Sequence, residues 1–195
     1  MARPRAFATE DVEDALLRVF WARGYANTSI DDLTGATGVL RGSLYAAYRS
    51  KEGMFRVATR RYLAELATAL ATRKKGLEGA RHVLDTVARL TVADPERRGC
   101  LVLNAIPESH ALGTDTRAEL HAALGSMQAL LRARLREAQA KAGTDVDLEP
   151  IVAMLFAAAV AIRVLGRAGA ERRLLRKIST GAIESARRWF ARGKE

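Results

Sequence analysis

The stretch Gly24-Tyr25-Ala26-Asn27-Thr28-Ser29-Ile30-Asp31-Asp32-Leu33, followed by Gly38-Val39-Leu40-Arg41-Gly42-Ser43-Leu44-Tyr45, decides the fold of this chain. It predicts two short helices that are joined by a tight turn at Gly38. Ser29 and Asp32 have the spacing of a capping box, with Asp in place of the usual Glu or Gln, which predicts that the first helix begins at residue 28 or 29. Many proteins use this geometry to place the second helix in the major groove of DNA.

Helical periodicity continues through the rest of the chain. Val12, Ala15, Leu16 and Phe20 recur at the spacing of one helix face, and we find no alternation of apolar and polar residues typical of a strand. The sequence therefore predicts an all-α fold of about nine helices. Their expected positions are residues 9–23, 29–37, 40–47, 51–74, 76–91, a helix opened by Asp94-Pro95, 115–142, 148–167 and 171–192.

Composition excludes several classes of protein. The net charge of +10 is spread evenly, with +5 over residues 1–75 and +5 over residues 76–195, so it indicates an anionic partner without locating the site. Cys100 is the one cysteine, which excludes an intramolecular disulfide and a four-cysteine zinc site. His82, His110 and His121 lack metal-ligand spacing. We expect no metal and no cofactor.

Neither catalysis nor membrane insertion is expected. No Ser-His-Asp set, paired carboxylates or phosphate-binding loop emerges, so the sequence does not predict an enzyme. The most apolar segment, residues 151–162, is closed by Arg163 and is shorter than the roughly 20 residues that a membrane span needs. We also find no N-terminal run that resembles a signal peptide. The expectation is a soluble cytoplasmic protein.

The second helix of the predicted pair has side chains suited to the major groove. Arg41 is a long donor whose small neighbours, Gly42 and Ser43, let the backbone approach DNA closely. Such an arginine can contact guanine O6 and N7 together, which is worth about 1–3 kcal/mol of discrimination. The helix N-termini at residues 28–29 and at residue 51 are suited to phosphate groups. The expected DNA-binding residues are Thr28, Ser29, Arg41, Gly42, Ser43, Tyr45, Ala46 and Lys51.

Several of these residues also have a purely structural interpretation. Thr28 and Ser29 can act as helix caps, and Lys51 can be an ordinary solvated lysine. Ala46 can contact a thymine methyl group, and the Tyr45 hydroxyl can reach a phosphate. We interpret Tyr48 as a core residue and not as a DNA contact.

Residues 7–55 resemble the DNA-binding domain of the tetracycline-repressor (TetR) family. The matching run is Phe20-x-x-x-Gly24-Tyr25-x-x-Thr28-Ser29-Ile30-x-x-Leu33-x-x-x-x-Gly38-Val39-x-x-Gly42-Ser43-Leu44-Tyr45-x-x-Tyr48-x-Ser50-Lys51-Glu52. The resemblance implies a helix-turn-helix domain at residues 1–55, with the motif itself at about residues 29–48. It also implies a C-terminal ligand-binding and dimerisation domain at residues 56–195.

The chain departs from the family where Ala46 and Ala47 replace larger polar or aromatic residues. That leaves fewer side chains for bases or phosphates, which Arg49 or a mobile basic arm with Arg3 and Arg5 can offset. The two alanines and the evenly spread charge support an alternative hypothesis. In that alternative the chain is a helical interaction module whose DNA-binding role has been lost.

The last two predicted helices, 148–167 and 171–192, have the small and apolar residues of a dimer interface. A two-fold DNA site requires a two-fold protein, and two such helices from each copy can form a four-helix bundle. The alternative is that they only close the core of their own chain. The expected interface residues are Met154, Leu155, Ala158, Ile162, Leu174, Leu175, Ile178 and Ile183.

Inward positions of the C-terminal region predict a mostly apolar ligand pocket, which suggests a hydrophobic or amphipathic small molecule. Asn104 and His121 are its expected polar anchors. We interpret Cys100 as a small buried thiol, with sensing of electrophiles beside Arg97 and Arg98 as the alternative. The expected pocket residues are Leu66, Val87, Cys100, Leu103, Asn104, His121, Met127, Leu130 and Phe156.

The resemblance implies a bacterial, ligand-responsive transcriptional regulator. A homodimer would bind a partly palindromic DNA operator and repress transcription. A small-molecule inducer would favour the form in which the two DNA-reading helices are wrongly spaced, and so release the operator. An activator is the alternative outcome of the same DNA binding.

Overall fold

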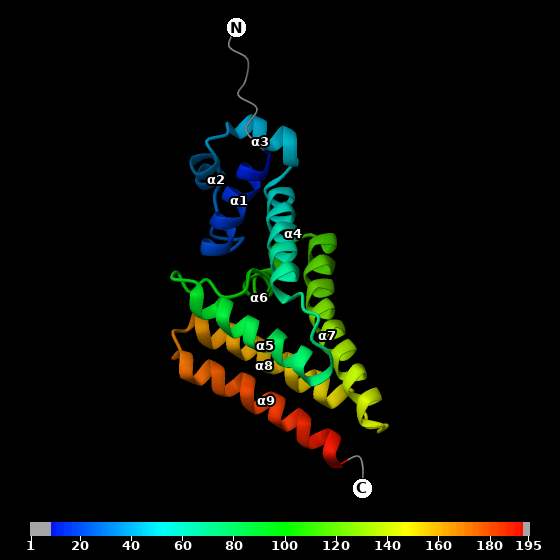
Figure 1. Ribbon diagram of the computed structural model, residues 1–195. Helices are drawn as coiled ribbons and strands as arrows, with labels where there is room; N and C mark the ends of the chain where they lie inside the picture. Colours follow the sequence, from blue (N-terminus) through cyan, green and yellow to red (C-terminus); the bar gives the residue numbers. More distant parts are fainter. Residues whose placement is uncertain (1–8, 193–195) are drawn as a thin grey trace. The chain divides into compact units, whose positions relative to one another are not determined.

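The computed structural model describes residues 9–192, and the regular structure of these residues is helical throughout (Figure 1). The all-α prediction is therefore confirmed. The predicted arm with Arg3 and Arg5 lies outside the described residues. The elements are α1 Thr9–Arg23, α2 Ile30–Thr37, α3 Arg41–Tyr48, α4 Lys51–Leu70, α5 Gly76–Ala93, α6 Leu101–Ala105, the 3-10 helix η1 Ser109–Ala111, α7 Thr114–Ala142, α8 Glu149–Arg167 and α9 Arg172–Arg192.

The chain forms two compact units, and neither is a single continuous piece of sequence. The first unit contains the described residues up to Leu66 together with Leu101–Leu120. The second contains Ala67–Cys100 and the described residues from His121 onward. The helix-turn-helix region therefore shares its unit with α6, η1 and the first turns of α7.

Aromatic side chains build the core of the first unit. Phe20 of α1 and Phe55 of α4 are fully buried, and their rings meet edge to face with centroids 5.3 Å apart. Tyr25 adds a second edge contact to Phe55 at 5.2 Å. Aromatic pairs of this geometry stabilise beyond the area that they bury. The cluster fixes α4 against α1 and against the turn that leads to α2.

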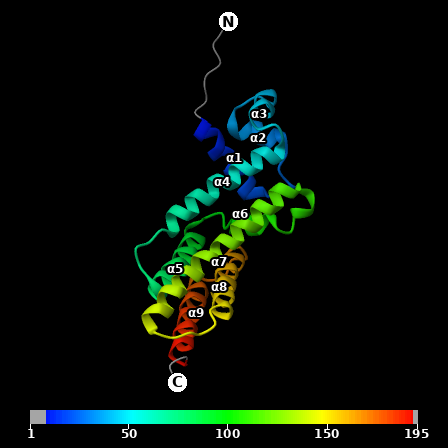
Figure 2. The same ribbon diagram turned by 90° about the vertical axis from the view of Figure 1, so that its right-hand side faces the viewer.

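The second unit is built on α5, α8 and α9, which contact one another pairwise and lie side by side in both views (Figure 1, Figure 2). Gly166 of α8 lets two of these helices approach closely, because a Cβ there would lie 2.1 Å from Cγ2 of Thr91 in α5. By length and composition alone α8 could cross a membrane. Its contacts with α5 and α9 and its buried Arg163 are those of a core helix of a helical unit.

One predicted helix start is wrong. Asp94-Pro95 does not open a helix, and α6 begins only at Leu101. The Asp94 carboxylate instead closes a loop by accepting hydrogen bonds from the backbone N–H of Arg98 at 2.6 Å and from its guanidinium at 2.9 Å. Burial raises the pKa of Asp94, but these hydrogen bonds outweigh it and the net pKa is lowered.

Candidate nucleic-acid interface

Helices α2 and α3 are joined by a three-residue turn that begins with Gly38. This glycine adopts a left-handed backbone conformation with φ of +67°, and its N–H donates to the Thr34 carbonyl at 2.9 Å. The next N–H, that of Val39, donates to Oγ1 of Thr37 at 3.2 Å. The turn is thus closed by local hydrogen bonds and a glycine that tolerates positive φ.

A complete capping box opens α2. The Asp32 N–H donates to Oγ of Ser29 at 3.0 Å, and the Ser29 N–H donates to the Asp32 carboxylate at 2.8 Å. The hydrogen bonds from Ser29, backbone first, lower the pKa of Asp32, with a further contribution from Arg23. Ser29 is exposed, and its hydroxyl donates to the Asp32 carboxylate at 2.7 Å, so a phosphate at this position would have to replace that carboxylate as the acceptor.

Thr28 lies inside the turn between α1 and α2. Its side chain is buried, at 2 % exposure, and its hydroxyl donates to the Gly24 carbonyl at 2.6 Å. This position leaves no exposed hydroxyl for a phosphate. Thr28 therefore stabilises the turn before α2. It does not make the direct contact with DNA that the sequence predicts.

The outer face of α3 carries the residues expected to read DNA. Arg41, Gly42, Ser43 and Ala46 are exposed, as is Ala47, while Leu44 anchors the opposite face in the core. No atom lies within 4 Å of the position that a Cβ on Gly42 would occupy, so this glycine leaves open space outside the protein. The face is therefore flat, with one long cationic side chain at its beginning.

Two tyrosines flank this face. Tyr45 is half-buried, and the Arg41 guanidinium carbon lies 5.7 Å from its ring centroid. Tyr48 is half-buried as well; burial first, and then the charge of Glu13, raises its pKa. Gly53 of α4 permits the sharp bend after α3, because a Cβ there would lie 2.0 Å from the Tyr48 carbonyl oxygen.

Lys51, at the start of α4, points toward the turn between α1 and α2. Its Nζ lies 4.6 Å from the Tyr25 ring centroid and donates to the Ala26 carbonyl at 3.4 Å. Burial lowers the pKa of Lys51, while Glu108 and Asp32 act in the opposite direction. This hydrogen bond is exposed and uses one of the three donors of the ammonium group, so a phosphate can still bind there.

Glu108 is a residue of this region that sequence reasoning missed. It precedes η1, and its carboxylate accepts the Ala26 N–H at 2.9 Å. The same carboxylate lies 2.6 Å from where a Cβ on Gly24 would be, so that only glycine fits against it without a shift. No local pattern indicated this contact, since it joins residues 82 positions apart.

Two further acidic residues connect α4 to the beginning of α7. Glu52 accepts hydrogen bonds from the Gly113 N–H at 2.9 Å and from the Thr116 hydroxyl. Glu119 accepts from Arg56 and, at 2.9 Å, from Arg60; the Arg56 hydrogen bond is the main reason why the pKa of Glu119 is lowered. The first unit is therefore held together by charged contacts as well as by its aromatic core.

The expected dimer residues divide into two groups. Leu155, Ile162, Leu175 and Ile183 are buried in the core of the second unit and have no surface left for a partner, which corrects their assignment. Apolar periodicity shows that a helix has a buried face but does not say which partner buries it. Met154, Ala158 and Ile178 are half-buried, and Leu174 is exposed. Val164 and Trp189, which the sequence analysis did not name, are also exposed apolar residues of α8 and α9.

The expected pocket residues fall in both compact units. Val87 is buried and His121 is exposed. The half-buried members are Leu66, Cys100, Leu103, Asn104, Met127, Leu130 and Phe156.

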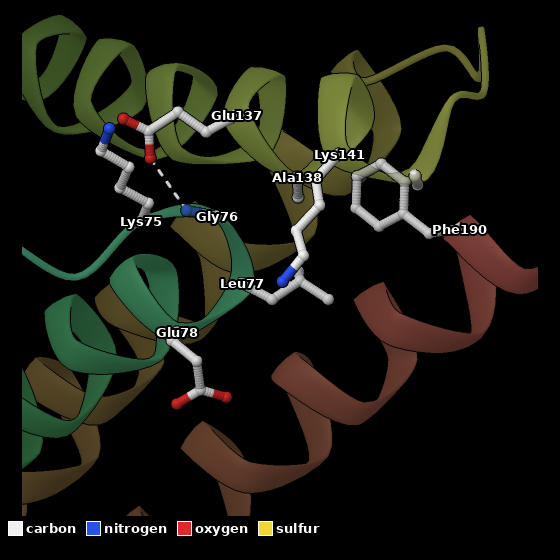
Figure 3. Close-up of a pocket in the computed structure, with 9 residues that line it drawn as sticks. Lys75, Gly76, Leu77, Glu78, Glu137, Ala138, Lys141 and Phe190 are labelled. Carbon is white, nitrogen blue, oxygen red and sulfur yellow. Dashed lines mark hydrogen bonds between the residues drawn. The ribbon is translucent and has the colours of Figure 1, made fainter.

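Two surface hollows of the described residues are lined by residues other than the expected pocket residues. One, of about 460 Å³, lies in the first unit beside the α3–α4 turn, where Arg49, Glu52 and Arg56 are among the residues that line it. The other, of about 520 Å³, lies in the second unit (Figure 3). There the Lys141 side chain lies between Leu77 and Phe190, and the Gly76 N–H donates to the Glu137 carboxylate at 2.8 Å. Neither hollow is lined by any of the nine expected pocket residues.

Two family models match the chain. Residues 14–58 match the family described as bacterial regulatory proteins, tetR family, and residues 76–180 match the tetracyclin repressor-like C-terminal domain. The chain belongs to the TetR family. This is a family of regulatory proteins and not of enzymes, which agrees with the sequence analysis.

Curated relatives of this TetR-family chain include two proteins of Escherichia coli K12. The HTH-type transcriptional repressor ComR is 32% identical over 107 residues, which are 52% of this chain and 51% of ComR. The HTH-type transcriptional repressor BdcR is 34% identical over 109 residues, which are 53% of this chain and 55% of BdcR. The matches thus span about half the length of these relatives.

A solved structure extends the similarity over nearly the whole chain. A cysteine mutant of the TetR family transcriptional regulator CifR, complexed with 26-bp double-strand operator DNA, is 32% identical to this chain. The alignment has a TM-score of 0.81 and covers 93% of this chain and 98% of the CifR chain.

We predict that Asp32→Asn destabilises the fold at neutral pH but not in strong acid. Because the pKa of Asp32 is lowered from its ordinary value of 3.8 in the folded state, the stability that its charge supplies is present above that value. It is lost as the pH falls through the lower folded-state pKa. Urea unfolding should therefore give a lower free energy of unfolding for the variant than for wild type at neutral pH. This difference should disappear below about pH 4. Asp31→Asn is the matched control, and an equal or pH-independent difference for both variants would contradict the prediction.

We also predict that Glu108→Ala exposes the amide of Ala26 to solvent. Loss of one such hydrogen bond, worth about 1 kcal/mol, should speed hydrogen exchange at Ala26 roughly fivefold. Glu96→Ala removes the same charge from an exposed loop residue and should leave that rate unchanged. Equal rates at Ala26 in wild type and Glu108→Ala would show that the carboxylate does not hold this turn.

Proposed function

We propose that this chain is a ligand-responsive transcriptional repressor that binds a palindromic operator as a homodimer. The observation that carries the proposal is the exposed face of α3, with Arg41 at its beginning and small residues after it. The similarity to CifR, whose structure contains operator DNA, supports the same function. The repressor names of ComR and BdcR support the direction of regulation.

In this proposal each residue of the interface has a separate role. Arg41 contacts a guanine, and Gly42 and Ser43 allow the helix backbone to come close to the base pairs. Ser29, the Tyr45 hydroxyl and Lys51 bind phosphate groups, which fix the position of α3 in the groove. Ala46 faces a thymine methyl group, and Thr28 acts indirectly by holding the turn before α2.

The proposed homodimer uses the surfaces of α8 and α9 that the chain's own core leaves uncovered. Val164, Leu174 and Trp189 are exposed there, and the half-buried Met154 and Ile178 lie on the same two helices. Burying such residues against a second copy removes apolar surface from water. Isologous packing then gives the two-fold symmetry that a palindromic operator requires.

The proposed inducer is a hydrophobic or amphipathic small molecule that binds in the C-terminal region of the chain. The dimer has one arrangement that fits the operator and another in which the two α3 helices are wrongly spaced. A ligand that binds the second arrangement more tightly than the first causes the dimer to leave the DNA. We place the protein in the cytoplasm, where its operator would be.

Selection of bound duplexes from a random pool tests the DNA-binding proposal. Wild type should enrich a two-fold motif, and Arg41→Ala should lose discrimination at one symmetric position by about 1–3 kcal/mol, the value of a bidentate guanine contact. Arg18→Ala removes an exposed charge from α1 and should leave the motif intact. Salt-sensitive binding without an enriched motif would contradict a sequence-specific reader, and no binding would favour an interaction module.

Transcription in vitro from a promoter with the selected site tests repression and induction. The protein should lower the amount of transcript, and a hydrophobic compound that raises its thermal unfolding midpoint should restore it. Stimulation of transcription by the protein would overturn the repressor assignment. A stabilising compound that leaves repression unchanged would overturn the proposed route of induction.

A further inference from the structure

Leu40 is the most exposed large apolar side chain among the described residues. Its exposed fraction is 79 %, against 52 % for Val164, which is next. The other exposed large apolar residues, Val92, Val164, Leu174 and Trp189, all belong to the second unit. Packing within the first unit therefore does not explain why an apolar residue stands at position 40.

Helix capping does not explain Leu40 either. It is the N-cap residue of α3, with an extended backbone, and its side chain makes no capping hydrogen bond. The N-cap of the preceding helix is Ser29, which forms a complete capping box. Ser, Thr, Asp and Asn are strongly preferred at N-caps over leucine. At this position the chain carries a residue that is unfavourable for α3 itself.

Leu40 lies next to the exposed face of α3 that we propose reads DNA. It directly precedes Arg41, Gly42 and Ser43, which are all exposed. Gly42 has no side chain and Ser43 has a short one, so neither residue extends far from the helix surface. The leucine is therefore exposed beside Arg41, at the N-terminal edge of a face whose other exposed residues are small. In helix-turn-helix proteins the N-terminal residues of the second helix contact base edges.

We propose that Leu40 selects thymine by contacting its C5-methyl group in each half-site of the operator. This inference rests on the proposed DNA-binding function. A leucine side chain has no hydrogen-bonding group, and the methyl group of thymine is the apolar feature that base pairs present in the major groove. The contact removes two apolar surfaces from water together. Arg41 then reads a neighbouring guanine, so that adjacent residues specify adjacent bases by different chemistry.

Replacement of thymine by deoxyuridine tests the proposal, because it deletes the methyl group and leaves base pairing unchanged. Each thymine of the selected operator is replaced in turn, symmetrically in both half-sites. Wild type should bind one of these duplexes about fourfold more weakly per methyl group lost, the effect of one buried carbon. Leu40→Ala should bind the unmodified operator more weakly and show no further loss at that same thymine.

Two controls separate the possible outcomes. Val92→Ala shortens an exposed apolar residue of α5 and should keep the full deoxyuridine effect. Leu40→Ser supplies a capping hydroxyl, so it should raise the thermal unfolding midpoint while losing the deoxyuridine effect.

Three results would overturn the proposal. In the first, wild type binds the operator and no deoxyuridine weakens its binding. In the second, deoxyuridine weakens binding equally in wild type and Leu40→Ala. In the third, Leu40→Ala binds every duplex more weakly by the same factor, whichever thymine is replaced. The last would mean that Leu40 touches sugar or backbone. If wild type binds no duplex, the proposed function itself fails, which is a distinct result.

Discussion

An eight-residue helix is not stable by itself in water, and α3 has only eight residues. Its position is therefore set by what holds its two ends and its inner face. Leu44 is its one fully buried residue, Gly38 permits the turn before it, and Gly53 permits the bend after it. The aromatic cluster around Phe55 fixes the platform on which these residues stand. Because the support lies on one side, the opposite face of α3 is left to contact other molecules.

The compact unit that contains α3 also contains Leu101–Leu120, a segment that lies far from the helix-turn-helix region in the sequence. Glu108 binds the α1–α2 turn, while Glu52 and Glu119 join α4 to the segment around the start of α7. Residues 106–113 therefore contribute to the support of α3 through the Glu108 carboxylate and the Gly113 N–H. Hydrogen bonds to these carboxylates are directional, so a displacement that bends or lengthens them weakens them.

Local sequence patterns were sufficient to predict most of the fold. Helix periodicity located the helices, and Ser29 with Asp32 gave the start of α2, because capping chemistry acts over three or four residues. The same reasoning failed at Asp94, whose carboxylate folds onto Arg98 and closes a loop. It also missed Glu108 and assigned Leu155 to a partner, because both depend on contacts between distant parts of the chain. Exposure separated Leu40 from the apolar residues of the core, and no periodicity could have done so.

We propose that two copies of this chain read one operator through their α3 helices. Sedimentation velocity with a fluorescent duplex measures this directly, using the full two-fold site and a duplex with one half-site scrambled. Two chains should bind the full site, and affinity should fall on the half-site, since one reading helix alone gives up half of the contacts. A single chain bound with equal affinity to both duplexes would contradict this proposal.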